Sequence, residues 1–148
     1  MTYSVEVGER CVFCAICAGD AEASIVYQDD EVVAFMDLFP VTRGHLLVIP
    51  RDHHVGLSDL PPAIGERLWG TGQNLADALR ASSIPCEGIN LLVCDGEVAD
   101  QSVFHFHLHV IPRTEGDGWT SLRHLGVVQE RAALDADARV IRDALSIA

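Results

Sequence analysis

The chain has 148 residues, 49% of them hydrophobic and 22% charged, which is typical of a globular domain with a proper core. Twenty-two acidic residues outnumber ten basic ones, all arginines, and the formal net charge is −12. Binding to nucleic acid or to an anionic membrane requires a basic surface, so the charge argues against both partners. No apolar run reaches the roughly 20 residues of a bilayer-spanning helix. Residues 1–10 lack the pattern of a signal peptide, so we expect a cytoplasmic protein.

The hydrophobic pattern predicts one α+β domain over residues 1–148. A flexible arm over 1–10 precedes a short helix over 11–18, and a main helix is expected over 60–82. Residues 114–148 form a C-terminal extension that contains a helix over about 127–146. The antiparallel sheet is expected to have about five strands, at 24–28, 31–37, 45–50, 88–94 and 102–112.

The last of these strands alternates histidines with hydrophobic residues. Successive side chains of a strand point to opposite faces, so His105, His107 and His109 are expected on one face. Neighbouring imidazoles would then lie about 6.6 Å apart along the strand. The opposite face is expected to pack against a helix through Phe104, Phe106, Leu108 and Val110.

This row of histidines has three explanations. The side chains can be polar residues on a solvated strand face, although three alternating histidines are an unusual choice for one. Alternatively, residues two apart on a strand can converge on one metal ion. In the third explanation, one imidazole acts as a nucleophile while its neighbours donate hydrogen bonds to a phosphate. The residues alone leave the two functional explanations open.

The segment His105-Phe-His107-Leu-His109-Val-Ile resembles the signature of the histidine triad (HIT) superfamily, in which three histidines alternate with hydrophobic residues. The resemblance extends to Phe35–Pro50 and to Gly88-Ile-Asn-Leu-Leu, and it covers residues 11–113. The size of the chain and its Cys11-x-x-Cys14 start are most similar to the small Hint-type branch. That branch hydrolyses nucleoside phosphoramidates and acts on purine nucleotides.

The resemblance implies catalytic roles for five residues. His107 matches the family nucleophile, which attacks the α-phosphate and forms a nucleotidyl-histidine intermediate that water then releases. A neutral imidazole is a good nucleophile near pH 7. His109 matches a residue that contacts phosphate oxygens, and His45 matches a supporting histidine. Gln101 and Ser102 match contacts to the phosphate and the leaving group. No catalytic metal and no organic cofactor are expected.

The resemblance also implies a nucleoside pocket. Asp37 matches the family carboxylate that holds the ribose hydroxyls. Four positions match residues that sandwich the base, although a role in the ordinary core is an alternative for each of them: Phe13, Ile16, Phe35 and Leu38. The chain departs from the family at Cys94, where many relatives have an asparagine that contacts the nucleotide. A thiol is a weaker donor and acceptor, so this departure points to lower activity or a changed substrate preference.

The pair Cys11-x-x-Cys14 alone is ambiguous between zinc binding, redox chemistry and buried thiols. A zinc site needs four ligands, and the resemblance implies a structural Cys₂His₂ site completed by His53 and His105. His54 is an alternative to His53. Cys17 is expected to pack on the short helix.

The sequence therefore predicts a phosphoramidase of the HIT type that binds a purine nucleotide such as AMP or an adenosine phosphoramidate. A homodimer formed by the main helix and an edge strand is expected from the resemblance. The alternatives are a dinucleoside polyphosphate hydrolase of the same fold and a metallohydrolase with His105, His107 and His109 as zinc ligands. A nucleotide-binding module without turnover is a further alternative, for which Cys94 is the suggestive feature.

Overall fold

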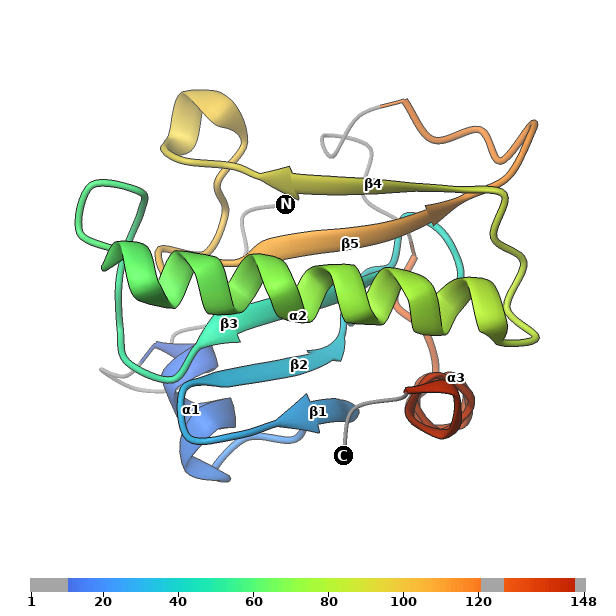
Figure 1. Cartoon of the computed structure of the whole chain (residues 1–148), viewed down its shortest axis with the longest axis horizontal. Helices are drawn as coiled ribbons and strands as arrows, with labels where there is room; N and C mark the ends of the chain where they lie inside the picture. Colours follow the sequence, from blue (N-terminus) through green and yellow to red (C-terminus); the bar gives the residue numbers. More distant parts are fainter. Residues whose placement is uncertain (1–10, 121–126, 146–148) are drawn as a thin grey trace.

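The structure is a computed structural model that describes residues 11–120 and 127–145. Its centre is a five-stranded antiparallel sheet with the strand order β1-β2-β3-β5-β4 (Figure 1). The strands are β1 (Ile25–Gln28), β2 (Val32–Met36), β3 (Leu46–Pro50), β4 (Gly88–Val93) and β5 (Leu108–Arg113). The predicted α+β fold with an antiparallel sheet is confirmed.

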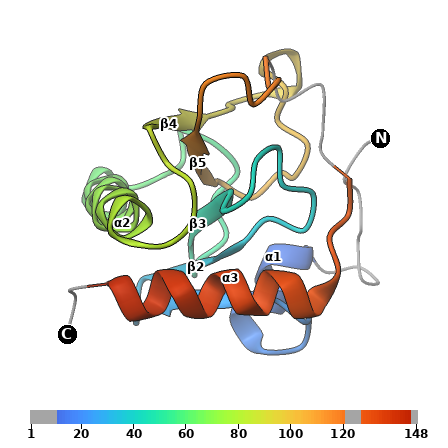
Figure 2. The same ribbon diagram turned by 90° about the vertical axis from the view of Figure 1, so that its right-hand side faces the viewer.

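Helices cover the sheet on both faces. The long helix α2 (Pro62–Ala81) packs on β3 and β5, while α3 (Arg131–Ala144) packs on β1, β2 and α2. The short helix α1 (Val12–Ala18) lies on the opposite face (Figure 2). A 3₁₀ turn, η1 (Glu97–Ala99), follows β4. Each predicted helix is present, although α3 begins at Arg131 rather than near residue 127.

The two faces of β2 and β3 are both buried, because alternate side chains enter different clusters. The cluster beneath α2 and α3 receives residues such as Ala34 and Val48. The cluster beneath α1 receives Phe35, Leu47 and their neighbours. Strands covered on both sides lose the polar–apolar alternation of a half-exposed strand. This arrangement leaves a sheltered layer beside α1 in which polar groups can be held away from water.

The histidine-bearing strand is shorter than predicted. The sequence predicts a strand over 102–112, whereas β5 starts at Leu108 and residues 101–107 form no ladder with a neighbouring strand. The backbone N–H of Phe106 instead donates to the carbonyl of His54, at 2.6 Å. Phe104 was predicted to be in the core, but its side chain is 50% exposed. The predicted start of the strand was wrong, because side chains can alternate between two faces in an extended segment that forms no hydrogen bonds to a neighbouring strand.

No helix among the described residues is long and apolar enough to span a bilayer. All five cysteines lie in the described ranges, and none of them forms a disulfide.

Candidate active site beside the short helix

The candidate site lies on the α1 face of the sheet, where three imidazoles lie close together and two of them pack against one aromatic ring. The ring of Phe13 on α1 lies 5.8 Å from the ring of His105 and 5.4 Å from that of His107, measured between centroids, with edge-to-face geometry. The rings of His107 and His109 lie 4.9 Å apart. All three histidines are buried. The predicted placement of the three side chains on one face therefore holds even though two of them precede the strand.

The orientation of His107 is fixed by its own backbone neighbourhood. Its Nδ1 lies 2.8 Å from the carbonyl oxygen of His105, and a carbonyl can only accept, so Nδ1 carries the hydrogen. The lone pair is then on Nε2. Burial lowers the pKa of His107 below its ordinary value, while the His105 carbonyl and the charge of Asp37 act in the opposite direction. A neutral imidazole with a free Nε2 lone pair is the nucleophilic form.

The tautomer of His109 is fixed through His45. The backbone N–H of Val41 donates to Nδ1 of His45 at 3.1 Å, so the hydrogen of a neutral His45 is on Nε2. That Nε2 lies 2.9 Å from Nδ1 of His109, which must accept and therefore carries its own hydrogen on Nε2. Burial lowers the pKa of both residues, that of His109 well below its ordinary value. His109 is thus a neutral N–H donor.

Asp37 supports this chain from the loop after β2. Its Oδ1 accepts the N–H of Phe39 at 2.8 Å, and its Oδ2 lies 3.4 Å from Nε2 of His45. The ligand atoms of Asp37, His45 and His109 are close enough together to surround a cation. A metal on Nε2 of His45 would require the hydrogen on Nδ1, where the Val41 N–H already points. The donor set therefore suits a hydrogen-bond chain better than a metal ion.

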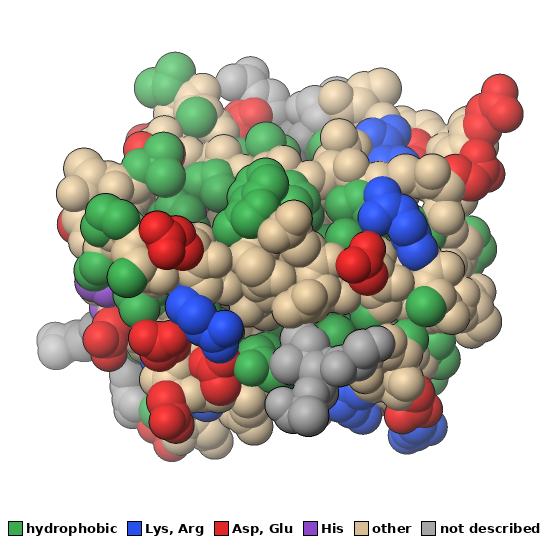
Figure 3. Space-filling model, viewed as in Figure 1, with side chains coloured by type: hydrophobic (Ala, Val, Ile, Leu, Met, Phe, Trp, Pro, Cys, Tyr) green, Lys and Arg blue, Asp and Glu red, His purple; other side chains and the backbone are tan. Residues whose placement is uncertain are grey.

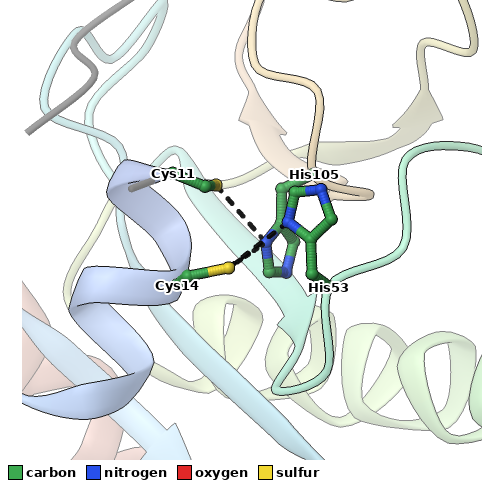
Figure 4. Close-up of side chains that lie close together, drawn as sticks. All are labelled: Cys11, Cys14, His53 and His105. Atoms are coloured by element: carbon green, nitrogen blue, oxygen red, sulfur yellow. Dashed lines mark hydrogen bonds between the residues drawn. The ribbon is translucent and has the colours of Figure 1, made fainter. Parts of the chain in front are cut away.

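Four other ligand groups gather at the start of α1. Nδ1 of His105 lies 3.6 Å from Sγ of Cys11 and 3.5 Å from Sγ of Cys14, and Nδ1 of His53 lies 3.3 Å from Sγ of Cys14 (Figure 4). With usual zinc bond lengths, a tetrahedral ion separates its sulfur and nitrogen ligands by about 3.5 Å. Nε2 of His105 lies 2.8 Å from the Pro50 carbonyl, so its hydrogen is there and Nδ1 keeps a lone pair. The four residues fit a tetrahedral zinc ion.

The structure distinguishes His53 from His54, which the sequence left as alternative ligands of the expected zinc ion. His53 belongs to the cysteine cluster. Nδ1 of His54 lies instead 4.0 Å from a carboxylate oxygen of Asp59. The backbone carbonyl of His54 accepts the N–H of Phe106 in the histidine segment.

Gln101 has a bracing role in this structure. Its amide nitrogen donates to the carbonyls of Val55 at 2.7 Å and Val103 at 3.1 Å, and its Oε1 accepts the N–H of Gly96 at 2.7 Å. The side chain is 4% exposed. Both amide hydrogens already have acceptors, so a contact to phosphate would require one of these bonds to break. Ser102 beside it is partly exposed.

The expected base-contacting residues fall into two groups. Phe13 and Phe35 are buried in the cluster beneath α1, with their ring centroids 5.4 Å apart, and Ile16 packs against the same cluster. Leu38 packs instead against the cluster beneath α2 and α3. The structure thus gathers the first three in one cluster, in which Phe13 lies beside His107, and directs Leu38 to the other face. Cys94 is buried beside Ile111, and burial raises the pKa of its thiol.

Two groups that shape the site carry no sequence signal. They are the N–H of Val41 and the carbonyl of Pro50, which set the tautomers of His45 and His105. Both are backbone groups: every residue offers a carbonyl, and every residue except proline offers an N–H.

The chain is similar to known proteins over most of its length. A family model, the HIT domain, matches residues 18–116. A HIT-like protein of Mycobacterium tuberculosis is 39% identical over 136 residues, covering 92% of this chain and 93% of that one. The crystal structure of a Zn-bound histidine triad family protein from Mycobacterium smegmatis matches with a TM-score of 0.81 and 40% identity, over 93% of this chain and 94% of that one.

A more distant relative has a named activity. The adenylylsulfatase HINT3 of Arabidopsis thaliana is 35% identical over 107 residues, which cover 72% of this chain and 54% of that protein. The region matched by the HIT domain model, residues 18–116, contains β1 to β5 and all three histidines of the row. On these similarities and on the buried, alternating histidines, the chain belongs to the histidine triad family.

Proposed function

We propose that the chain is a nucleotide-binding hydrolase that transfers a nucleotidyl group from a purine nucleoside 5′-phosphoramidate, or a related phosphoanhydride, to His107 and then to water. The observation that carries this proposal is the bond from Nδ1 of His107 to the His105 carbonyl. It holds the imidazole in the tautomer whose Nε2 can attack phosphorus. The named relative that is an adenylylsulfatase supports the adenylyl substrate class.

The reaction has two displacement steps. Nε2 of His107 forms a bond to the α-phosphorus as the bond from phosphorus to the leaving nitrogen breaks, and the amine leaves after taking up a proton from solvent. Water then attacks phosphorus, the bond to Nε2 breaks, and the nucleoside monophosphate leaves while a proton returns to solvent. The net reaction consumes one water. His109 donates its Nε2 hydrogen to a phosphate oxygen in both steps, which stabilises the charge that develops there.

The alternatives differ in how well the geometry supports them. A dinucleoside polyphosphate hydrolase would use the same two steps with a nucleotide as leaving group. A metallohydrolase would need His105, His107 and His109 to converge on one ion. Among the described residues, His105 and His109 belong to different ligand groups, and His107 belongs to neither.

Covalent catalysis predicts a trapped intermediate on His107. Acid quenching of the protein during turnover of adenosine 5′-phosphoramidate should give an added adenylyl mass in intact-protein mass spectrometry. His107→Ala should lose the adduct and at least about 10³-fold in kcat, while AMP binding persists. His54→Ala, which removes a neighbouring imidazole outside the proposed machinery, is the control and should behave like the wild type.

Two results would contradict this mechanism. Product formation without an adduct, abolished by a chelator, would favour the metallohydrolase. Binding of AMP without any turnover of phosphoramidate, adenylyl sulfate or dinucleoside polyphosphate would favour a binding module.

We further propose that Cys11, Cys14, His53 and His105 hold one structural zinc ion. Burial lowers the pKa of His105 to about 4, so its imidazole is neutral and able to ligate at pH 7. A bound zinc would cross-link α1, the loop after β3 and the segment before β5. The similar structure from Mycobacterium smegmatis is described as Zn-bound.

Serine substitutions on α1 test the zinc site. Cys14→Ser should weaken zinc binding by more than about 100-fold, because the substitution removes a thiolate ligand. Cys17→Ser makes the same change one turn along the same helix and should retain one zinc per chain. Zinc content after dialysis and competition with a chromogenic chelator measure both. Equal zinc content in the two variants would count against the proposed ligand set.

Buried neutral histidines also predict a pH-dependent stability. Burial keeps the folded pKa of His45 and His109 below 6.5, the ordinary value retained on unfolding. The unfolded chain therefore binds more protons below pH 6.5, and the free energy of unfolding falls as the pH falls from about 6.5 toward the folded pKa. Each such histidine adds a slope of up to about 1.4 kcal/mol per pH unit.

The pH prediction is tested by urea unfolding between pH 8 and pH 5. His45→Gln and His109→Gln should each reduce the slope below pH 6.5 relative to the wild type, since the other titrating groups are unchanged. Identical slopes in all three proteins would mean that neither histidine is held neutral by the fold.

We also propose a homodimer formed through β4 and α2. Strand β4 is an outer strand of the sheet, and its residues Gly88–Val93 include no charged residue or proline that would protect an open edge. Arg67 on α2 reaches Asp29 and Glu31 near the β1–β2 turn. Trp69 is two residues later, about 200° around the helix, so it points away from β1 and β2, and it is 53% exposed. Figure 3 shows hydrophobic side chains gathered between α2 and β4.

A charge placed on this surface should separate the subunits. Trp69→Glu should shift the mass measured by sedimentation at micromolar concentration from twice 16.1 kDa toward 16.1 kDa. Val98→Glu is the control, because Val98 on η1 is 95% exposed and the net charge changes equally. A wild-type protein that sediments as a monomer would overturn the proposal.

A further inference from the structure

The loop between β2 and β3 is cross-linked by hydrogen bonds among its own backbone and side-chain groups. The N–H of Asp37 donates to the carbonyl of His45 at 3.0 Å, and the N–H of Val41 donates to Nδ1 of His45 at 3.1 Å. Asp37 in turn accepts the N–H of Phe39. A displacement of this 37–45 loop would therefore move Asp37 and His45 together.

The outside of this loop is held by the C-terminal part of the chain. Nη2 of Arg43 donates to Oδ1 of Asp137 on α3 at 2.8 Å, and Nε donates to the same oxygen at 3.1 Å. The N–H of Gln129, just before α3, donates to the carbonyl of Leu38 at 3.4 Å. Both contacts come from residues beyond 116, where the match to the HIT domain ends.

Helix α3 has an anchorage of its own that does not involve Arg43. Leu134, Ala138 and Ile141 are buried in the core cluster. The hydroxyl of Ser24 also donates to Asp135 at 2.6 Å. The helix is therefore a fixed support, and loss of the Arg43 contact would loosen one side of the loop without removing the helix. The loop would keep the bond from the Thr42 hydroxyl to the Pro112 carbonyl on β5, at 2.7 Å.

We propose that Arg43 is a positioning residue: through Asp137 it holds the 37–45 loop at the place where Asp37 contacts the nucleoside. This inference rests on the proposed function, and it assigns to α3 a part in nucleotide binding. His107, which carries the chemical step, is not on the loop. Loosening the loop should therefore weaken nucleotide binding more than it slows the reaction.

The expected size of the effect on nucleotide binding follows from the solvent exposure of the Arg43–Asp137 ion pair. The Arg43 side chain is 57% exposed and that of Asp137 is 14% exposed. An ion pair of this kind, with two nitrogens on one carboxylate, stabilises its geometry by a factor of about three to five. Arg43→Ala and Asp137→Asn should each raise the KM for adenosine 5′-phosphoramidate, and the Kd for AMP, by about that factor. The kcat should stay within about twofold of the wild type.

Three further variants separate positioning from a general loss of stability. The double variant Arg43→Ala/Asp137→Asn should be no worse than either single variant, because both remove the same contact. Arg43→Lys should restore part of the affinity. Asp77→Asn is the control: Asp77 forms an exposed pair with Arg80 on α2, at 3.7 Å, and its loss should leave KM unchanged. Urea unfolding of each variant reports stability separately.

Amide hydrogen exchange measures how firmly the 37–45 loop is held when no ligand is bound. Amide exchange in the 37–45 segment should become about three- to fivefold faster in Arg43→Ala and unchanged in Asp77→Asn. Unchanged exchange in Arg43→Ala, or equally faster exchange throughout the sheet, would overturn this inference whether or not the protein hydrolyses phosphoramidates. A wild type that neither binds AMP nor turns over any adenylyl compound would instead overturn the proposed function.

Discussion

The hydrogen bond from the Val41 N–H to Nδ1 of His45 is the constraint on which the phosphate side of the site depends. It decides where His45 carries its hydrogen, and through the 2.9 Å contact it decides the same for His109. A backbone N–H can only donate, so the hydrogen bonds run in one direction, from Val41 to His45 and from His45 to His109. Without it, His45 and His109 could each adopt either tautomer, and Nε2 of His109 would carry a hydrogen only part of the time.

Backbone carbonyls do the same for the other two histidines. Those of Pro50 and His105 take the ring hydrogens of His105 and His107, respectively. One residue, His105, therefore turns its side chain toward the cysteines and its carbonyl toward the nucleophile. The Cys/His ligand cluster and the proposed nucleophile are separate sites, yet they share this residue. A structural metal held by the cluster would lie next to the proposed covalent chemistry without taking part in it.

Much of this arrangement could be predicted from the sequence, because side-chain alternation and motif spacing are local properties. The pattern from His105 to Val110 predicted the common face of the histidines, whereas the Cys11-x-x-Cys14 pair alone was ambiguous and pointed to the ligand cluster only through the resemblance to the family. The start of β5 could not be predicted, since Phe106 bonds to the distant carbonyl of His54. The bracing by Gln101 and the Arg43–Asp137 pair join segments far apart in the chain, and no local pattern records such contacts.

The charges of the site residues explain why contacts to the nucleoside are expected to matter for affinity. Burial keeps His45, His107 and His109 neutral, and Asp37 adds a negative charge near the phosphate. Two of the described arginines, Arg67 and Arg113, pair with carboxylates elsewhere. In a chain with a net charge of −12, neutral donors can orient a phosphate, but they attract it weakly over distance. Under the proposed function, affinity would then come from burying the base and from the ribose hydroxyls on Asp37, and the placement of the 37–45 loop would affect binding more than a contact to the phosphate.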